Sequence, residues 1–160
     1  MESSGSKIHD MFDQDAVRSL GWQFADACNL RDSEAFRQLW IPDGIWTIGE
    51  PLPFVGKGVD AIVSAFDGLL AQWEYFIQLP HAPVVQIDGD EAESRWTVAE
   101  EARSPDCETG YSNMGYYQDR IVRTPTGWKY AARTYTYLYL DTTPQSGNAY
   151  PRPPLRSLIS

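Results

Sequence analysis

The sequence predicts an α+β fold, in which a strongly curved, mostly antiparallel sheet wraps around three N-terminal helices as a cone-like barrel. Apolar residues recur at helical spacing through the first half of the chain, whereas residues 84–140 form runs of strand-forming residues separated by turn signals. Helices followed by a run of antiparallel strands are typical of the α+β class. The chain of 160 residues has the size of one domain. A curved sheet around helices predicts a pocket at the open end of the cone.

The helical half begins with an amphipathic helix over residues 14–29, whose apolar stripe comprises Val17, Leu20, Phe24 and Cys28. A short second helix reaches Trp40, and either Asp32 or Ser33 caps its start. After a glycine-containing loop over residues 51–58, a third helix is expected over residues 59–76.

The sheet is expected from short segments with strand-forming composition, at residues 45–48, 84–87, 91–101, 111–122 and 128–140. Asp88-Gly89-Asp90 is a hairpin turn signal, and a second turn is expected at residues 124–127. Residues alternate between the two faces of a strand. The strand at 91–101 therefore carries Trp96 and Glu100 on one face and Glu101 on the other.

Composition and charge limit the function of the chain. The net charge of −9 argues against nucleic acid and anionic membranes as partners, because both require basic patches. No apolar run approaches membrane-spanning length, and the N-terminal residues lack the apolar core of a signal peptide. Cys28 and Cys107 are expected to be unpaired thiols in a reducing cytosol. We therefore expect a cytoplasmic protein that acts on a small molecule, without metal or cofactor.

Several local patterns follow one another in an order that resembles a known family. They are Asp32-Ser33-Glu34-Ala35-Phe36 before Pro42-Asp43-Gly44-Ile45-Trp46, then Phe54-Val55-Gly56-Lys57-Gly58, then His81 before Ile87-Asp88-Gly89-Asp90, and finally Gly115-Tyr116-Tyr117-Gln118-Asp119 before Gly127-Trp128-Lys129 and Arg133. This ordered set resembles the SnoaL-like branch of the nuclear transport factor 2-like superfamily. The chain is similar to scytalone dehydratase, bile acid 7α-dehydratase and lindane dehydrochlorinase, which are lyases that use an Asp–His pair without a cofactor.

The resemblance implies a division of the chain. Residues 12–140 form the SnoaL-like domain, residues 1–11 are expected to be a flexible N-terminus, and residues 141–160 form a proline-rich tail that wraps a surface or a neighbouring subunit. Members of this fold usually associate through the outer face of the sheet. We therefore expect a homo-oligomer, with a trimer favoured over a dimer.

The resemblance also places His81 at the histidine of these lyases and Asn29 at their aspartate. Histidine is suited to proton transfer near neutral pH, so His81 is expected to enter the pocket as general acid or base. Asparagine takes up no proton, but it can hold an imidazole or a substrate oxygen. The alternatives are a partly buried histidine bonded to a carbonyl and an asparagine in a left-handed conformation at the helix end.

Three more residues are candidate catalytic groups. Burial would raise the pKa of Glu100 if its strand face lines the pocket, although a bulge would turn Glu101 inward instead. An inward Arg133 would stabilise an oxyanion, or else it pairs with Asp119 across the strands. The hydroxyl of Tyr117 would donate a proton or a hydrogen bond, unless the residue only packs in the core. The expected walls of the substrate pocket are Trp46, Trp96, Phe24 and Tyr135.

These residues predict a cofactor-independent lyase that acts by acid–base catalysis on a small aromatic or alicyclic alcohol. Its reaction is dehydration, or C–C cleavage through a quinone methide in the catabolism of aromatic compounds. One alternative is a ketone or polyketide isomerase or cyclase, with Glu100 as base and Tyr117 as oxyanion donor. A further alternative is a non-catalytic domain that only binds a ligand.

Overall fold

A computed structural model describes residues 4–81 and 83–152 of the chain. The helices are α1 (Ser4–Leu30), α2 (Ser33–Gln38) and α3 (Val59–Ala71). The strands are β1 (Trp40–Ile48), β2 (Phe54–Lys57), β3 (Tyr75–Pro80), β4 (Val84–Asp88), β5 (Glu91–Arg103), β6 (Gly110–Thr124) and β7 (Gly127–Asp141).

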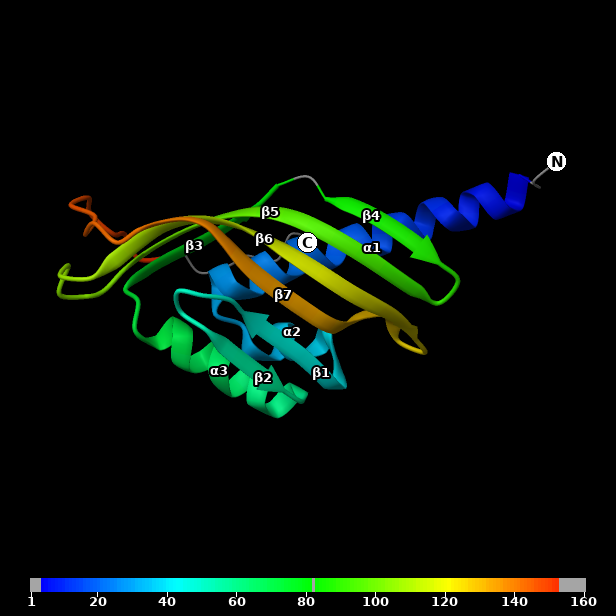
Figure 1. The fold of residues 1–160 in the computed structure, drawn as a ribbon, viewed down its shortest axis with the longest axis horizontal. Helices are drawn as coiled ribbons and strands as arrows, with labels where there is room; N and C mark the ends of the chain where they lie inside the picture. Colours follow the sequence, from blue (N-terminus) through cyan, green and yellow to red (C-terminus); the bar gives the residue numbers. More distant parts are fainter. Residues whose placement is uncertain (1–3, 82, 153–160) are drawn as a thin grey trace, which may run out of the picture.

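The predicted α+β class is confirmed, because three helices pack with one curved, unclosed sheet across the described residues (Figure 1). Neighbouring strands follow the order β2-β1-β7-β6-β5-β3, and β4 also pairs with β5. All pairs are antiparallel except that of β1 with β7. The long strands β5, β6 and β7 form the centre of the sheet and arch across α1 (Figure 1).

Three segments differ from the prediction. The first helix starts at Ser4 rather than near Gln14, since no proline interrupts residues 4–30, and its first turns extend beyond the sheet (Figure 1). The third helix ends at Ala71, and residues 75–80 form β3, because aromatic and β-branched residues there pair with β5. Residues 54–57, expected within a loop, form β2 against β1.

The core is built around one aromatic side chain of α1. Phe24 is fully buried, and its ring centroid lies between 5.0 and 6.5 Å from the rings of Phe36, Trp40, Trp46, Tyr117 and Tyr130. These rings come from α2, β1, β6 and β7, so Phe24 joins the helices to the sheet. The predicted apolar stripe of α1 is buried at all four positions.

Alternation along β5 is also confirmed. Trp96 is buried and Arg95 is exposed, and the pairing of β5 with β6 runs without a shift in register along the whole of β5. Because no bulge reverses the alternation, Glu100 points to the inner face and Glu101 to the outer face. Of the two carboxylates that the sequence left as alternatives, the sheet therefore presents Glu100 on its inner face.

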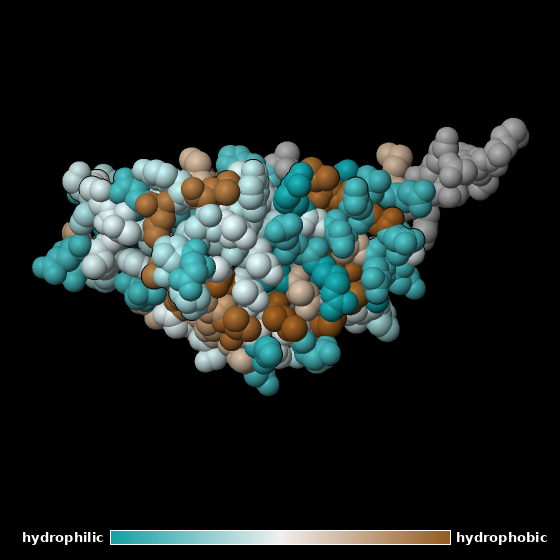
Figure 2. Space-filling model, viewed as in Figure 1, coloured by the Kyte–Doolittle hydropathy of each residue, from teal (hydrophilic) through white to brown (hydrophobic). Residues whose placement is uncertain are grey.

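Among the residues described, no helix is both long and apolar enough to cross a bilayer. Figure 2 shows hydrophobic residues in several separate patches, set among hydrophilic ones. Of the expected tail, residues 142–152 are described and residues 153–160 lie outside the described residues, and two residues of the described part contact the sheet. Arg103 donates to the carbonyl oxygen of Gly147, and Gln145 donates to the carbonyl oxygen of Tyr111 at 3.3 Å.

The close contact between α1 and the sheet generates a prediction about stability. A Cβ atom at Gly21 would overlap the ring of Trp96, which is fully buried and has no room to move. Gly21→Ala should therefore lower the free energy of unfolding by about 1–3 kcal/mol. Gly68 of α3 has nothing near its Cβ position, so Gly68→Ala should raise it by about 0.5–1 kcal/mol. Urea denaturation measures both, and a neutral Gly21→Ala would contradict this packing.

Candidate active site

A cavity of about 940 Å³ lies between α1, α3 and the inner face of the sheet. Many aromatic side chains line it, namely Phe24, Trp46, Phe54, Phe66, Trp73, Phe76, Tyr111, Tyr117, Tyr135 and Tyr137. A hollow with apolar walls and a few polar groups is typical of a site for a small molecule. Phe24, Trp46 and Tyr135 thus line the cavity as the sequence predicted.

Glu100 is the central polar group of this cavity. Its Oε1 accepts a hydrogen bond from Nε2 of Gln78 at 2.5 Å, and its Oε2 accepts one from Nδ2 of Asn113 at 2.9 Å. Burial raises the pKa of Glu100, and the two amide hydrogen bonds and the charge of Arg133 only partly oppose this effect. The site therefore holds a fixed carboxyl group that exchanges its proton closer to neutral pH than an exposed glutamate does.

The two amides that hold Glu100 are themselves fixed. Asn29, near the end of α1, donates to the backbone oxygen of Gln78 at 2.9 Å and accepts from its backbone nitrogen at 2.7 Å. Asn113 accepts a hydrogen bond from the hydroxyl of Tyr135. Asn29 thus positions Gln78, and the left-handed residue after α1 is Arg31, with a φ of 59°. The expected contact of Asn29 with the imidazole of His81 is not found.

Three tyrosine hydroxyls border the cavity without a hydrogen-bond partner in the described part of the chain, those of Tyr111, Tyr117 and Tyr137. Burial, reinforced by the charge of Glu100, raises the pKa of Tyr117 well above its ordinary value and that of Tyr137 to about 12. These hydroxyls therefore keep their protons near neutral pH. They are available to donate hydrogen bonds to a ligand oxygen.

Arg133 does not reach the cavity, so the expectation that it meets the substrate is wrong. Its side chain is 1% exposed and stacks on the rings of Tyr117, Phe24 and Tyr130, with its Cζ 3.8, 4.2 and 4.6 Å from the ring centroids. Its Nε faces Oδ1 of Asp119 at 3.6 Å. The alternative pairing with Asp119 is the one found, and Arg133 supports the cavity wall from behind.

Trp96 is likewise absent from the cavity wall. Its ring is fully buried against α1 at Gly21, and its Nε1 donates to the hydroxyl of Ser94 at 3.2 Å. The expectation of a substrate contact at Trp96 is therefore wrong, because this ring fills the space between the helix and the sheet.

His81 lies outside the cavity, and the expectation that its imidazole enters the pocket is wrong. Its side chain is exposed just beyond β3, and its backbone N–H donates to the carbonyl oxygen of Thr97 at 2.8 Å. The reason is the alternation of β3, in which Phe76 and Gln78 point inward. The sequence analysis missed both amides that hold Glu100, those of Gln78 and Asn113. For Gln78, the strand-forming residues before it were the available signal.

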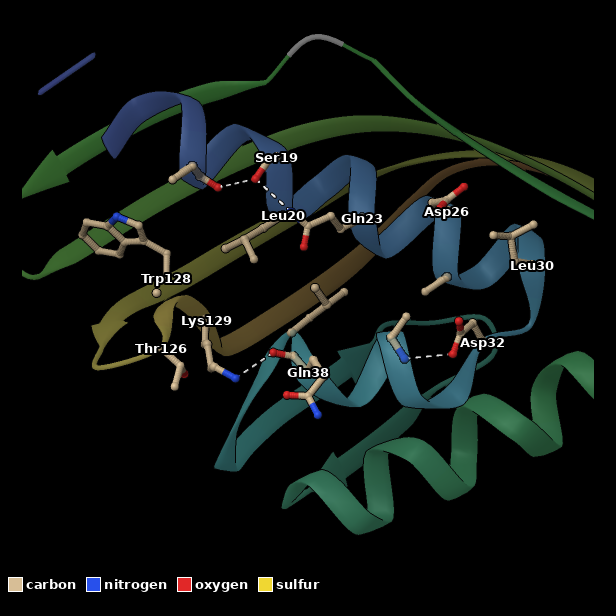
Figure 3. A pocket seen from close by; sticks show the side chains of 15 residues that line it. Ser19, Leu20, Gln23, Asp26, Leu30, Asp32, Gln38, Thr126, Trp128 and Lys129 are labelled. Atoms are coloured by element: carbon tan, nitrogen blue, oxygen red, sulfur yellow. Dashed lines mark hydrogen bonds between the residues drawn. The ribbon is translucent and has the colours of Figure 1, made fainter. Parts of the chain in front are cut away.

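A smaller hollow of about 510 Å³ lies between α1, α2 and the turn that joins β6 to β7 (Figure 3). Asp26 borders this groove rather than the cavity around Glu100. Lys129 donates to the carbonyl oxygen of Gln38 at 2.8 Å, and Asp32 caps α2 through the N–H of Ala35 at 2.9 Å (Figure 3). Lys129 and Asp32 thus serve structural contacts. The cavity around Glu100, which has a buried carboxyl group, is the candidate active site.

Both cysteines are free thiols, as predicted. Cys28 lines the cavity, and burial raises the pKa of its thiol, whereas Cys107 is exposed. Across residues 4–81 and 83–152, no three histidine, cysteine, aspartate or glutamate side chains gather closely enough to hold a metal ion.

The sequence model of the SnoaL-like domain family matches residues 10–134. The chain belongs to this family. No curated protein matches the sequence. Among solved structures, the SnoaL-like chain is similar to a putative aromatic ring hydroxylase from Novosphingobium aromaticivorans, with 23% identity over 83% of this chain and 94% of that one and a TM-score of 0.77.

Two further solved structures carry the names of lyases. A hexachlorocyclohexane dehydrochlorinase, LinA type 2, is 14% identical over 93% of this SnoaL-like chain and 99% of its own, with a TM-score of 0.79. A putative scytalone dehydratase from Novosphingobium aromaticivorans is 15% identical over 88% of this chain and 97% of its own, with a TM-score of 0.74. At these identities the likeness establishes the shared fold.

The buried carboxyl group makes the stability of the protein depend on pH. The pKa of Glu100 in the folded state lies above the ordinary value of 4.5, so the folded protein binds this proton more tightly than the unfolded chain. This stabilisation is fully present below pH 4.5 and is lost as the pH rises through the folded-state pKa. Glu100→Gln should therefore gain free energy of unfolding relative to the wild type across that window, by at most about 1 kcal/mol for each pH unit.

Urea denaturation at a series of pH values measures this difference. Glu101→Gln is the matched control, because it removes the neighbouring carboxylate from the outer face of the same strand. The comparison uses only how the difference in free energy of unfolding between variant and wild type changes with pH. A change in stability that is the same at every pH therefore does not affect it. A difference between Glu100→Gln and wild type that stays flat or falls with pH would contradict the raised pKa.

Proposed function

We propose that this protein is a lyase that needs no cofactor and removes water from an aromatic or alicyclic alcohol bound in the cavity, with Glu100 as its proton-transferring group. The observation that carries the proposal is the carboxyl of Glu100, held by two amides in a ring-lined cavity. Its raised pKa suits a group that first takes and then returns a proton.

The proposed reaction uses one carboxyl group for both proton transfers. The substrate in this scheme carries a carbonyl group β to its hydroxyl group, and the carboxylate of Glu100 takes a proton from the carbon between them. The electron pair of that C–H bond forms the C=C bond of an enolate, while the π pair of the C=O bond moves onto the oxygen. The pair on oxygen then re-forms the C=O bond, the enolate C=C pair forms the new C=C bond, and the C–O bond to the hydroxyl group breaks. Glu100 gives its proton to the departing hydroxyl, which leaves as water.

The hydroxyls of Tyr117 and Tyr137 are suited to stabilise the enolate oxygen. Because their pKa values are raised, they donate hydrogen bonds without losing their protons. Gln78 and Asn113 keep the carboxylate of Glu100 in one orientation, and Asn29 holds Gln78. The aromatic walls contact the substrate ring and exclude water. Only Glu100 changes its protonation state in this scheme.

The names of two structural neighbours, a dehydrochlorinase and a putative scytalone dehydratase, support elimination as the outcome. C–C cleavage through a quinone methide, as in the breakdown of aromatic compounds, is a variant of the same departure of a hydroxyl group. A second candidate is an isomerase or cyclase, in which Glu100 returns the proton to another carbon. The unpartnered tyrosine hydroxyls beside Glu100 would stabilise the enolate of an isomerase as well as that of a lyase. Only the reaction products distinguish the two functions.

We also propose that the protein is a homo-oligomer, with a trimer favoured, that associates through the outer face of the sheet. Leu79, Ala99, Met114 and Tyr139 form one cross-strand row there, and Leu79, Met114 and Tyr139 are each at least half exposed. A face with several apolar side chains in water is suited to protein contacts. Sedimentation that finds only monomers at micromolar concentration would contradict this assembly.

The catalytic role of Glu100 is tested by comparing three variants. A screen of ring alcohols for absorbance changes first identifies a substrate. Glu100→Gln should then lower kcat by about 10²–10⁴-fold, because general acid–base catalysis contributes on that order. Glu101→Gln removes a carboxylate from the outer face, and His81→Ala removes an exposed imidazole, so both should keep the wild-type rate.

NMR spectroscopy of the same reactions in D₂O separates the candidate functions. Loss of water from the substrate identifies the lyase, whereas deuterium exchange or double-bond migration without water loss identifies the isomerase. An active Glu100→Gln together with an inactive His81→Ala would overturn the proposal. Ligand binding without turnover by any variant would support the non-catalytic alternative.

A further inference from the structure

The cavity is larger than a single-ring compound requires. Its volume of about 940 Å³ lies near the upper end of the ~300–1,000 Å³ typical of sites that hold drug-sized ligands. The wall extends from Phe24 and Cys28 of α1 to Glu108 and Thr109 before β6 and to Thr142 after β7. A ligand that contacts both Glu100 and this outer part of the wall must therefore extend beyond one ring.

The charges of the wall have one sign. Two glutamates, Glu100 and Glu108, line the cavity, and the described lining residues include no lysine, arginine or histidine. Arg133 lies behind Tyr117 and Phe24 and faces Asp119, so its charge is not offered to a ligand. An anion that entered would lose its hydration, meet no cation and lie close to the carboxyl of Glu100.

The polar groups that do face the cavity suit an uncharged ligand. Tyr111, Tyr117 and Tyr137 offer hydroxyls that have no partner among the described residues. They can each donate one hydrogen bond to a hydroxyl or carbonyl oxygen. Both oxygens of Glu100 already accept an amide N–H, so this carboxyl group does not depend on a cationic ligand for its hydrogen bonds.

We propose that the substrates of this site are uncharged, multi-ring compounds that carry a hydroxyl or carbonyl oxygen, and that the cavity excludes analogues that bear a carboxylate. This inference rests on the proposed function and narrows its substrate class by size and by charge. The rings contact the aromatic wall, and the oxygen lies between Glu100 and the tyrosine hydroxyls.

Binding of matched probes to the purified protein tests this selectivity. 1-Pyrenemethanol and 1-pyrenecarboxylate share four fused rings and differ in charge, whereas benzyl alcohol keeps the hydroxymethyl group on one ring. Titrations followed by pyrene fluorescence give the first two affinities, and competition with 1-pyrenemethanol gives the third. The wild type should bind 1-pyrenemethanol at least about tenfold more tightly than either other probe.

Two variants locate the discrimination within the cavity. Glu100→Gln removes the negative charge from the wall and should reduce the difference in affinity between 1-pyrenemethanol and 1-pyrenecarboxylate. Glu101→Gln removes the same charge from the outer face and should leave this difference unchanged. An unchanged difference in Glu100→Gln would place the probes elsewhere and overturn the inference.

Three results with the wild type would also overturn it. They are equal or tighter binding of 1-pyrenecarboxylate, equal or tighter binding of benzyl alcohol, and no saturable binding of 1-pyrenemethanol. Because these titrations involve no turnover, their failure leaves the catalytic test of Glu100→Gln intact. Conversely, full activity of Glu100→Gln would overturn the proposed function and leave the measured selectivity standing.

Discussion

The buried carboxyl group of Glu100, in a cavity lined by aromatic rings, is the constraint on which the rest of this structure depends. Gln78, Glu100 and Asn113 are direct cross-strand partners on β3, β5 and β6, so the register of the sheet places all three side chains on its inner face. Burial of a carboxyl is unfavourable unless hydrogen bonds compensate for its lost hydration. The two amides supply such bonds and leave the pKa of Glu100 raised.

The surrounding elements maintain this row. Asn29 joins the end of α1 to the backbone of β3, which fixes the strand that carries Gln78. On the other side, the guanidinium of Arg133 stacks on Tyr117 and pairs with Asp119, so a buried charge supports a cavity wall without entering the cavity. The polar groups are thus divided between an inner site that can meet a ligand and a buried pair that cannot. This division is the basis of the selectivity for uncharged ligands that we propose.

Much of the fold could be predicted from sequence, because β5 and the centre of β6 alternate regularly and α1 carries a clear apolar stripe. The same alternation placed Glu100 and Glu101 on opposite faces of β5, and the unbroken register of β5 with β6 decides that Glu100 is the inward one. The error at His81 arose from β3. Trp73 and Phe76 fit helical spacing, so the sequence predicts that the third helix runs on to residue 76, over the start of β3. That prediction hides the alternation of β3, which points Gln78 inward. Arg133 illustrates a different limit, since only the packing of Phe24 and Tyr117 in three dimensions separates it from the cavity.

The titration of the Glu100 side chain is the most direct measure of this account. Carbon-13 NMR of the side-chain carboxyl groups, with the Glu100 signal assigned by its absence in Glu100→Gln, reports the midpoint of this one group. The account predicts a midpoint above the ordinary value of 4.5, because burial outweighs the two amide hydrogen bonds. A midpoint at or below 4.5 would show a solvated or strongly stabilised carboxylate and would contradict its role as the proton carrier.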